Sequence, residues 1–590
     1  MAEKEPQEKR KKQSVISDFV YSTKFQKLFS EHWHNRTDIK TDNLEIISKP
    51  FRVCRISNFI CSEELMDEIK NELLDVRIRR NCIDLYQFEQ TEDLVSIDRE
   101  ILNLLYETFQ TDLTEWMERN TNIRLSKKIS MSSSCYYDTD YLLCHDDNMG
   151  DRKIAFVLYL SKDWTEDDGG ALDLFDTDEN NLPRNVVKSL IPEYNSLVFF
   201  EVVENSYHQV AEITSPDKSR WSINGWFHGP LRPRVWRPRT EVLSNYIDPV
   251  PERVDLQYWI SECYLFPKII KQIQQDVETS SYTFLSHYLK DGIYETLQTD
   301  VASDAIVWKK VGPADIRNYE VADEETLPDL LKQFYNMFKS VTMFQLLKDY
   351  TELDLIVSED EITKPRMQIE LQRWTSGCYT LICDKLLDNE PYTYVNDDKY
   401  YSNKAYSSET EEAQENTSNN SNDDEDKNNT ISECNTPLSS TDQKELDESD
   451  LLQKMVQSKC ARTVSKNLLM PSPLKLKSSS PQKPRYRDTD ESDVSDIADY
   501  LSDPVECSDL EEEPGVLDVI IQFNTSHLGD DHTIDYVNPK EQDGVLIQVP
   551  SKDNHLCLVF KNVSVTRLHK YVNHYCTDYF YNLICTYYED

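Results

Sequence analysis

The sequence predicts an α+β fold, mainly β, with two double-stranded β-helix (jelly-roll) domains that are buttressed by helices and a long disordered acidic insertion in the second. At 590 residues the chain is too long for one hydrophobic core. Helical patterns precede runs of short β-rich segments, and one long stretch lacks core-forming residues. The expected parts are a tail with a short helix (1–45), a first domain (46–238), a discontinuous second domain (239–400 and 515–590) and the insertion (401–514).

Helices are expected before the first set of strands. A short helix is predicted around residues 17–34, and Ser62 is a suitable start for a second one. Leu65, Ile69 and Leu73 recur at i, i+4 and i+8, which gives that helix one apolar face. A third helix is predicted over residues 96–119.

Seven short β segments follow Asn122, rich in Tyr, Val, Phe and Ile and separated by turn signals such as Asp168-Gly169-Gly170. They read SMSSSCYYD, YLLCHDD, IAFVLYLS, GALDLFD, SLVFFEV, HQVAEI and RWSINGWFHG. Many short strands after two helices favour a jelly roll with helices on one sheet. Pro230, Pro233 and Pro238 mark its end.

The second domain shows a similar order of helices and then strands. Helical patterns are expected between residues 252 and 350, and strands over 367–374 and 378–387. Beyond the insertion, further strands are predicted in VLDVIIQF, GVLIQVP, HLCLVFKNVSV and NLICTYYE. His532 and Asp535 are expected in a turn.

Charge limits the classes of partner. The chain has 107 acidic against 64 basic residues, a formal net charge of −43. This balance disfavours direct contact with nucleic acid or an anionic membrane and favours a basic protein partner. Acidic tails that merely keep the chain soluble explain much of the same charge equally well.

The cysteine pattern and the N-terminus bear on the compartment. Fourteen cysteines are scattered with no C-x-x-C pair, and Cys378 and Cys383 are the nearest to one another. This indicates reduced thiols in the cytoplasm or nucleus. The first residues lack the apolar core of a signal peptide, and the apolar runs are too short to span a bilayer. The run 9–12 (KRKK) is either a nuclear-import signal or an ordinary charged tail.

Three side chains suggest a metal centre. His145 and Asp147 are two residues apart, so on a strand both would face one side. His208 follows after sixty intervening residues, which leaves room for about four strands before the chain returns. Two histidines and one carboxylate can hold Fe(II) on one octahedral face and leave the other open for a co-substrate and O2. Each residue alone fits a solvated turn or ordinary packing equally well.

A candidate anion site follows the second histidine. Arg220 and Ser222 share one face of a predicted strand. An arginine in a barrel interior needs an anion, and its fork suits the far carboxylate of 2-oxoglutarate. A salt bridge to a neighbouring acid is the alternative. The hydroxyl of Tyr159 could reach the same carboxylate, although a strand tyrosine is more often core packing.

The segments YLLCHDD, RKIAFVLYLSKDW, GGALDLFD, SYHQVAEI and RWSINGWFHGP resemble the ribosomal prolyl 3-hydroxylases, which are Fe(II)- and 2-oxoglutarate-dependent oxygenases. The resemblance is dense over about residues 50–238 and thinner beyond. It implies that a prolyl residue of a small-subunit ribosomal protein is hydroxylated with 2-oxoglutarate and O2, which affects translation, and that L-ascorbate assists.

The resemblance also assigns individual residues. It puts the iron ligands at His145, Asp147 and His208, and the 2-oxoglutarate site at Arg220 with Tyr159 beside it. Tyr136 matches a further tyrosine that lines the pocket. The same family has two β-helix domains, of which only the first is catalytic.

Two other readings stay open on the residues alone. The same three ligands serve oxygenases that act on lysine, such as lysyl hydroxylases and demethylases. An inactive barrel with a long acidic tether would instead be an interaction module. An assay of Fe(II)-dependent 2-oxoglutarate turnover distinguishes the interaction module from the oxygenases.

Overall fold

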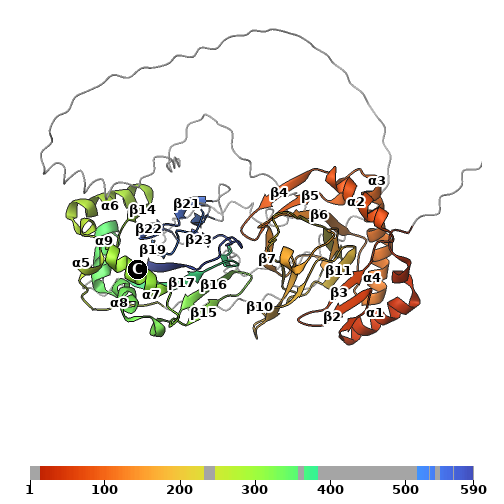
Figure 1. The fold of residues 1–590 in the computed structure, drawn as a ribbon, viewed down its shortest axis with the longest axis horizontal. Helices are drawn as coiled ribbons and strands as arrows, with labels where there is room; N and C mark the ends of the chain where they lie inside the picture. The colour runs from red at the N-terminus through yellow and green to blue at the C-terminus, as the bar shows by residue number, and fades with distance from the viewer. Residues whose placement is uncertain are drawn as a thin grey trace, which may run out of the picture. The chain divides into compact units, whose positions relative to one another are not determined.

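The computed structural model describes residues 14–231, 246–356, 365–382, 515–529, 532–538, 545–562 and 564–588. The predicted insertion (401–514), the basic run 9–12 and the prolines at 233 and 238 lie outside the described residues. The described strands form a 13-stranded, an 8-stranded and a 3-stranded sheet, and all three belong to one compact unit (Figure 1).

The first sheet system contains the candidate site. Its strands are β1 (Ile39–Lys40), β2 (Leu44–Ile47), β3 (Val53–Ser57), β4 (Ile78–Cys82), β5 (Tyr86–Thr91), β6 (Ile129–Tyr136), β7 (Tyr141–His145), β8 (Arg152–Tyr159), β9 (Leu172–Thr177), β10 (Pro183–Leu190), β11 (Ser196–Glu201), β12 (His208–Val210) and β13 (Arg220–His228). Their order is β1-β2-β3-β11-β8-β13-β6-β5-β7-β12-β9-β10, with β4 on β5, and every pairing is antiparallel. The order brings late strands beside early ones, as a jelly roll requires.

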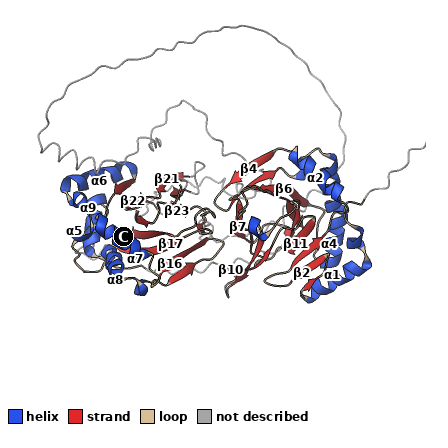
Figure 2. Ribbon diagram, in the orientation of Figure 1, coloured by secondary structure: helices blue, strands red, loops and turns tan. Residues whose placement is uncertain are grey.

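Helices cover one face of this system. They are η1 (Asp18–Tyr21), α1 (Thr23–Asn35), α2 (Glu63–Leu74), η2 (Leu94–Ser96), α3 (Glu100–Thr108), the π-helical turn η3 (Phe109–Leu113) and α4 (Thr114–Thr121), and a further turn, η4 (Glu166–Asp168), lies between β8 and β9. The predicted start of α2 is confirmed, because Ser62 Oγ accepts from Leu65 N at 3.2 Å. The helix predicted over 96–119 is interrupted by η3. Figure 2 shows α1, α2 and α4 grouped on one side of the strands.

The two faces of β8 bury different cores. Phe156 and Leu158 face the helices and pack in one cluster with residues such as Phe29 and Trp116. Ala155 and Tyr159, on the alternate positions, face the barrel interior with Leu174 and Val198. The barrel interior, which contains the candidate site, is therefore separated from the helices by one layer of strands.

The second system has the same kind of organisation. Its strands are β14 (Tyr282–Ser286), β15 (Trp308–Val311), β16 (Arg317–Ala322), β17 (Arg366–Trp374), β18 (Tyr379–Thr380), β19 (Val516–Phe523), β20 (Thr533–Val537), β21 (Val545–Pro550), β22 (His555–Lys561), β23 (Thr566–His569) and β24 (Phe580–Tyr588). Its helices are α5 (Leu256–Trp259), η5 (Glu262–Leu265), α6 (Pro267–Ser280), α7 (Asp291–Val301), η6 (Glu324–Thr326), α8 (Asp329–Lys339) and α9 (Val341–Thr351). The helices and the large sheet share one core.

The strand pairings repeat between the two systems. In the first, β13 lies between β6 and β8, and β8 also pairs with β11. In the second, β24 lies between β17 and β19, and β19 also pairs with β22. Similarly, β9 pairs with β10 and β12, as β20 pairs with β21 and β23. These matches run in the same chain order.

Several elements differ from the prediction. The sequence analysis gave no separate strands for β1, β2, β4, β5, β10, β14, β15, β16, β20 and β23. The turn predicted around Asp535 is wrong, because this residue lies inside β20 and is fully buried. Of the strand predicted over 378–387, the described part contains only the short β18. Among the described helices, none is long and apolar enough to cross a membrane.

Candidate metal centre and anion pocket

Two strands present the histidines to each other. His145 is the last residue of β7 and His208 is the first residue of β12, and the two are paired Cα partners in the antiparallel ladder. Their ring centroids lie 4.2 Å apart. The residues between the two histidines supply β8 to β11, so the structure confirms the predicted return of a late strand beside an early one.

The carboxylate of Asp147 also lies beside the two histidines, but a backbone conformation other than the predicted strand places it there. It does not lie on the strand face of His145, because β7 ends at His145 and Asp147 has a φ of 59°. This left-handed conformation is one that Asp tolerates better than most residues. The turn, and not a two-residue strand repeat, directs the carboxylate to the histidines.

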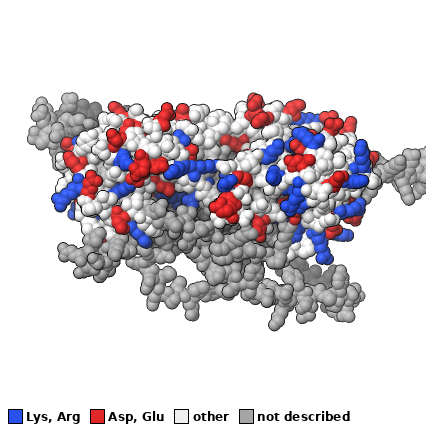
Figure 3. Space-filling view, turned by 90° about the horizontal axis from the view of Figure 1, so that it is seen from below, with Lys and Arg blue, Asp and Glu red and all other residues white. Residues whose placement is uncertain are grey.

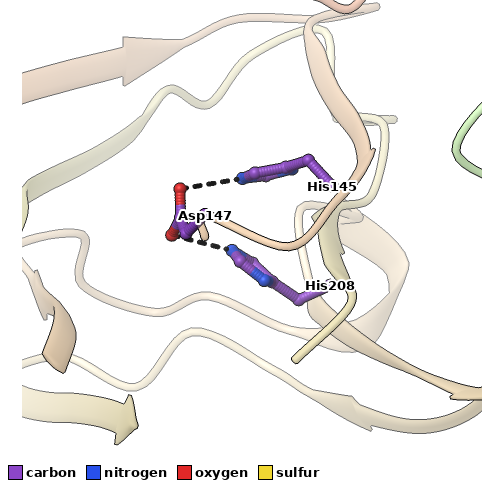
Figure 4. A group of neighbouring side chains, drawn as sticks. All are labelled: His145, Asp147 and His208. Carbon is purple, nitrogen blue, oxygen red and sulfur yellow. Dashed lines mark ion pairs between the residues drawn. The ribbon is translucent and has the colours of Figure 1, made fainter. Parts of the chain in front are cut away.

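The three side chains form a compact ligand set (Figure 4). Asp147 Oδ1 lies 3.6 Å from His145 Nε2, and Asp147 Oδ2 lies 3.5 Å from His208 Nε2. All candidate ligand atoms lie within 4.8 Å of one another. Among the described residues, this is the one group of three His, Cys, Asp or Glu side chains with such geometry.

Hydrogen bonds orient both imidazoles for metal binding. His145 Nδ1 donates to Leu143 O, and His208 Nδ1 donates to Ser206 O, each at 2.8 Å. A carbonyl can only accept, so the proton is on Nδ1 and the lone pair of Nε2 points toward Asp147. This is the arrangement that metal-ligating histidines use. The residues present therefore fit a divalent transition metal.

Electrostatics keeps the set ready for a cation. Burial, together with the neighbouring His208, lowers the pKa of His145 to about 4, so its imidazole is neutral at neutral pH. Burial alone would raise the pKa of Asp147, but the neighbouring His208 and His145 and the guanidinium of Arg152 lower it below the usual value. Neutral imidazole and ionised carboxylate are the forms that bind a metal.

A buried guanidinium lies in the same barrel interior. Arg220 begins β13, is 1% exposed, and stacks between the rings of Tyr136 and Tyr159 at 5.1 and 5.0 Å. Its Nη2 donates to Tyr159 Oη at 3.5 Å, and its Nε has no hydrogen-bond partner. Within the described part of the chain, Arg220 forms no ion pair, so the structure shows no salt bridge to an acid among these residues. A buried cation without a counter-charge indicates an anion site.

The other predicted pocket residues surround this arginine. Tyr136 is the Cα partner of Arg220 across β6 and β13, and Ser222 is the partner of Tyr159 across β13 and β8. All four are buried. Burial raises the pKa of Tyr136, although Arg220 opposes this, so the phenol stays a hydrogen-bond donor. The structure thus brings every predicted anion-site residue together.

Two residues beside the metal centre were missed by the sequence analysis. Arg152 Nη1 lies 3.7 Å from Asp147 Oδ1, and its guanidinium stacks over Trp226 at 3.7 Å. The indole Nε1 of Trp226 is buried without a partner. Trp226 lies six residues after Arg220 on β13, so the two-residue repeat could have found it. No pattern in the sequence marks Arg152.

A glycine gives Arg220 its space. Gly170 has a φ of +65°, and a Cβ there would lie 2.8 Å from Arg220 Cδ and 2.5 Å from Ile213 Cδ1. Contacts this short would displace the arginine side chain. The Asp-Gly-Gly segment therefore shapes the anion pocket in addition to making a turn.

Comparison with known proteins assigns the class. Residues 131–228 match the model of the 2OG-Fe(II) oxygenase superfamily, a range that contains all three candidate metal ligands and Arg220. Residues 252–590 match the model of the oxoglutarate and iron-dependent oxygenase degradation C-term family. Fold and site together define a 2-oxoglutarate- and Fe(II)-dependent oxygenase.

Curated relatives narrow this class. Prolyl 3-hydroxylase OGFOD1 of Mus musculus is 37% identical over 385 residues, which are 63% of this chain and 69% of that protein. Prolyl 3-hydroxylase OGFOD1 of Xenopus laevis is 32% identical over 66% of this chain and 80% of its own length. Prolyl 3-hydroxylase sudestada1 of Drosophila melanogaster is 32% identical over 61% and 68%. The chain belongs to this prolyl 3-hydroxylase family and is a 2-oxoglutarate-dependent dioxygenase.

Proposed function

We propose that this chain hydroxylates the 3-position of a prolyl residue in a small-subunit ribosomal protein and thereby affects translation. The observation that carries the proposal is the convergence of two Nδ1-donating histidines and Asp147 beside the unpaired, buried Arg220. The names of the relatives support proline as the target residue. The ribosomal target rests on the resemblance noted from the sequence.

The proposal assigns a role to each site residue. His145, Asp147 and His208 hold Fe(II), and Arg220 binds the far carboxylate of 2-oxoglutarate. Fe(II), with 2-oxoglutarate and O2, supplies the oxidising chemistry for C–H hydroxylation. Tyr136, Tyr159 and Ser222 are assigned to the same co-substrate pocket, where burial excludes water and strengthens the charge-assisted bonds.

A basic protein surface is the proposed partner, without direct contact to nucleic acid or membrane. The net charge of −43 supports a cationic partner. Figure 3 shows Lys and Arg interspersed with Asp and Glu on the face it presents.

The second sheet system is proposed to be a non-catalytic double-stranded β-helix. Its matching strand pairings support the architecture. The ladder places Phe580 opposite Trp374, as it places Arg220 opposite Tyr136. Trp374 is fully buried and stacks on His569 at 4.3 Å and on Tyr319 at 5.0 Å. Aromatic rings therefore fill the place where the first system holds its anion-binding arginine.

The remaining expectations belong to the same proposal. The proposal divides the chain into the parts 1–45, 46–238, 239–400 with 515–590, and 401–514, the last of which lies outside the described residues. L-Ascorbate maintains activity by returning oxidised iron to Fe(II). The protein acts in the cytoplasm and nucleus, which the reduced-cysteine pattern and the basic run 9–12 support.

The test is incubation of the full chain with Fe(II), 2-oxoglutarate and a proline-containing peptide of the decoding-centre ribosomal protein, followed by mass spectrometry. We expect one added oxygen on proline and an equivalent amount of succinate. His145→Ala and Asp147→Ala should abolish both products while the circular dichroism spectrum is retained. Normal turnover by either variant would refute the metal assignment.

The same experiment separates the alternatives. Loss of a methyl group from a lysine, or an added oxygen on lysine, would identify an oxygenase with another target residue. Absence of succinate with every peptide, in protein that binds Fe(II), would favour an interaction module. Either result would overturn the prolyl assignment.

A further inference from the structure

The outer face of the metal-binding strands is covered by the C-terminal part of the chain. Cys144 precedes His145 on β7 and therefore faces away from it, and Tyr207 is the residue immediately before β12. Both are buried and form one apolar cluster with Phe175 of β9 and Ala314, which lies between β15 and β16. The packing that lies directly behind both histidines therefore includes a residue of the second sheet system.

A second apolar cluster continues this cover along β7. Tyr141 and Leu143 pack with Tyr379 of β18 and with Leu381, which directly follows that strand. The ring of Tyr571, after β23, lies 4.3 Å from that of Tyr141. Three of the five residues of β7 thus contact the C-terminal part through apolar side chains.

Hydrogen bonds fix the segment 571–575 to the ends of β6 and β12. Glu212 lies two residues after β12, and its carboxylate accepts from His574 N at 2.9 Å and Tyr571 Oη at 3.2 Å. Asp138 lies two residues after β6 and pairs with His574 Nε2 at 2.8 Å and Tyr575 Oη at 2.5 Å.

The carboxylate of Glu212 is buried. Only 8% of Glu212 is exposed, and burial raises the pKa of its carboxyl group. The hydrogen bonds from the C-terminal segment therefore stabilise the ionised form of Glu212. A buried carboxylate that loses its donors is costly, so removal of either donor should disturb β12.

We propose that Ala314, Tyr379, Leu381, Tyr571 and His574, the supporting cluster, position β7 and β12 and so hold His145 and His208 at the separation that a metal requires. None of these residues contacts the metal ligands, so they are positioning residues. Helices α1 to α4 cover the outer face of β8 and β11. The supporting cluster covers the outer face of β7 and β12 in the same way. The inference rests on the proposed metal site.

The test compares metal affinity and amide exchange in the full-length apoprotein. Tyr571→Ala and Glu212→Ala should weaken Co(II) binding by about 10-fold, the lower end of the range for losing a direct outer partner of a metal ligand, because they act through the strands. Amide hydrogen exchange in residues 141–145 and 208–212 should become faster. Glu212→Gln keeps an acceptor for His574 N and should stay within about threefold of wild-type Co(II) affinity.

Leu297→Ala is the matched control. Leu297 is fully buried in the core of the second sheet system, outside the supporting cluster. This variant should lower the melting temperature and leave Co(II) affinity unchanged. If it weakens Co(II) binding as much as Tyr571→Ala does, general instability is the cause and the inference is wrong.

The two proposals fail in different ways. Wild-type protein that binds Co(II) but hydroxylates no peptide would refute the proposed function and leave the positioning role standing. Protein that never binds Co(II) would refute the metal site, and the exchange rates would still decide whether the supporting cluster orders β7 and β12. Tyr571→Ala with wild-type amide exchange and Co(II) affinity would refute the inference. If the alanine variant does not fold, the same two measurements on Tyr571→Phe decide it.

Discussion

His145 and His208 are direct partners in the ladder between β7 and β12. The distance between the two imidazoles is therefore set by backbone pairing across a long loop closure, and not by neighbouring sequence. The ligand set exists only when the barrel is closed. Metal affinity should consequently report on the folding of this barrel as well as on the ligands themselves.

Arg220→Ala should mainly raise the KM for 2-oxoglutarate. The guanidinium is the buried cation of the pocket, and losing one charge-assisted fork costs about 2–5 kcal/mol. Steady-state kinetics over a range of 2-oxoglutarate concentrations measures this, and Co(II) titration of the apoprotein serves as the control. An unchanged KM would remove Arg220 from the co-substrate site.

Gly170→Ala should raise the same KM without changing metal affinity. The new methyl group would lie 2.8 Å from Arg220 Cδ and would displace that side chain. Gly377→Ala is the control, because Gly377 also has a positive φ, +85°, but a methyl group added there would meet no atom within 4 Å. If both variants lose stability equally and neither alters the KM, backbone strain alone explains the effect.

Asp518→Asn should destabilise the second sheet system by about 3–5 kcal/mol. Asp518 is fully buried and accepts from Arg567 Nη1, Tyr536 Oη and Thr586 Oγ1 at 2.7–2.8 Å. The substitution leaves the charge of Arg567 without its partner. Urea denaturation measures the loss, and the double variant Asp518→Leu/Arg567→Met should recover much of it. Equal instability of the single and double variants would contradict this account.

The free energy of unfolding should fall as the pH drops below about 6.5, the usual pKa of a histidine. Burial, with a contribution from Arg567, lowers the pKa of His569 well below that value. The unfolded chain then binds a proton that the folded chain excludes, which costs at most about 1.4 kcal/mol per pH unit. Denaturation at several pH values should give a shallower fall for His569→Phe. Curves that stay parallel from pH 5 to 8 would rule out His569 as a source.

The sequence singles out the three side chains that the structure brings together, but it predicts the local geometry of one of them incorrectly. The residue types and their order identify His145, Asp147 and His208, because few other arrangements bind iron and a keto acid. The assumed strand repeat at Asp147 fails, since β7 has already ended. Backbone dihedrals at a strand end depend on tertiary contacts that no short pattern contains.

Two of the missed strands, β4 and β5, have weak hydrophobic alternation. The strand Ile78–Cys82 reads IRRNC and is largely polar, and its partner Tyr86–Thr91 has a single apolar repeat. Their pairing with each other and with β6 defines them, which is long-range information. The amphipathic helix α2 was found because its burial on one side is visible in the sequence, and the strands β8 and β11 were found because burial on both faces gives them nearly continuous apolar runs.

The positive φ of Asp147 restricts which amino acids this position can accept. A longer acid such as glutamate would supply the same charge, yet it fits this backbone poorly and would place its oxygens one bond further along. Asparagine would suit the backbone but would remove the charge. Both the backbone conformation and the need for a negative charge in the proposed metal site therefore limit which residues are tolerated at position 147.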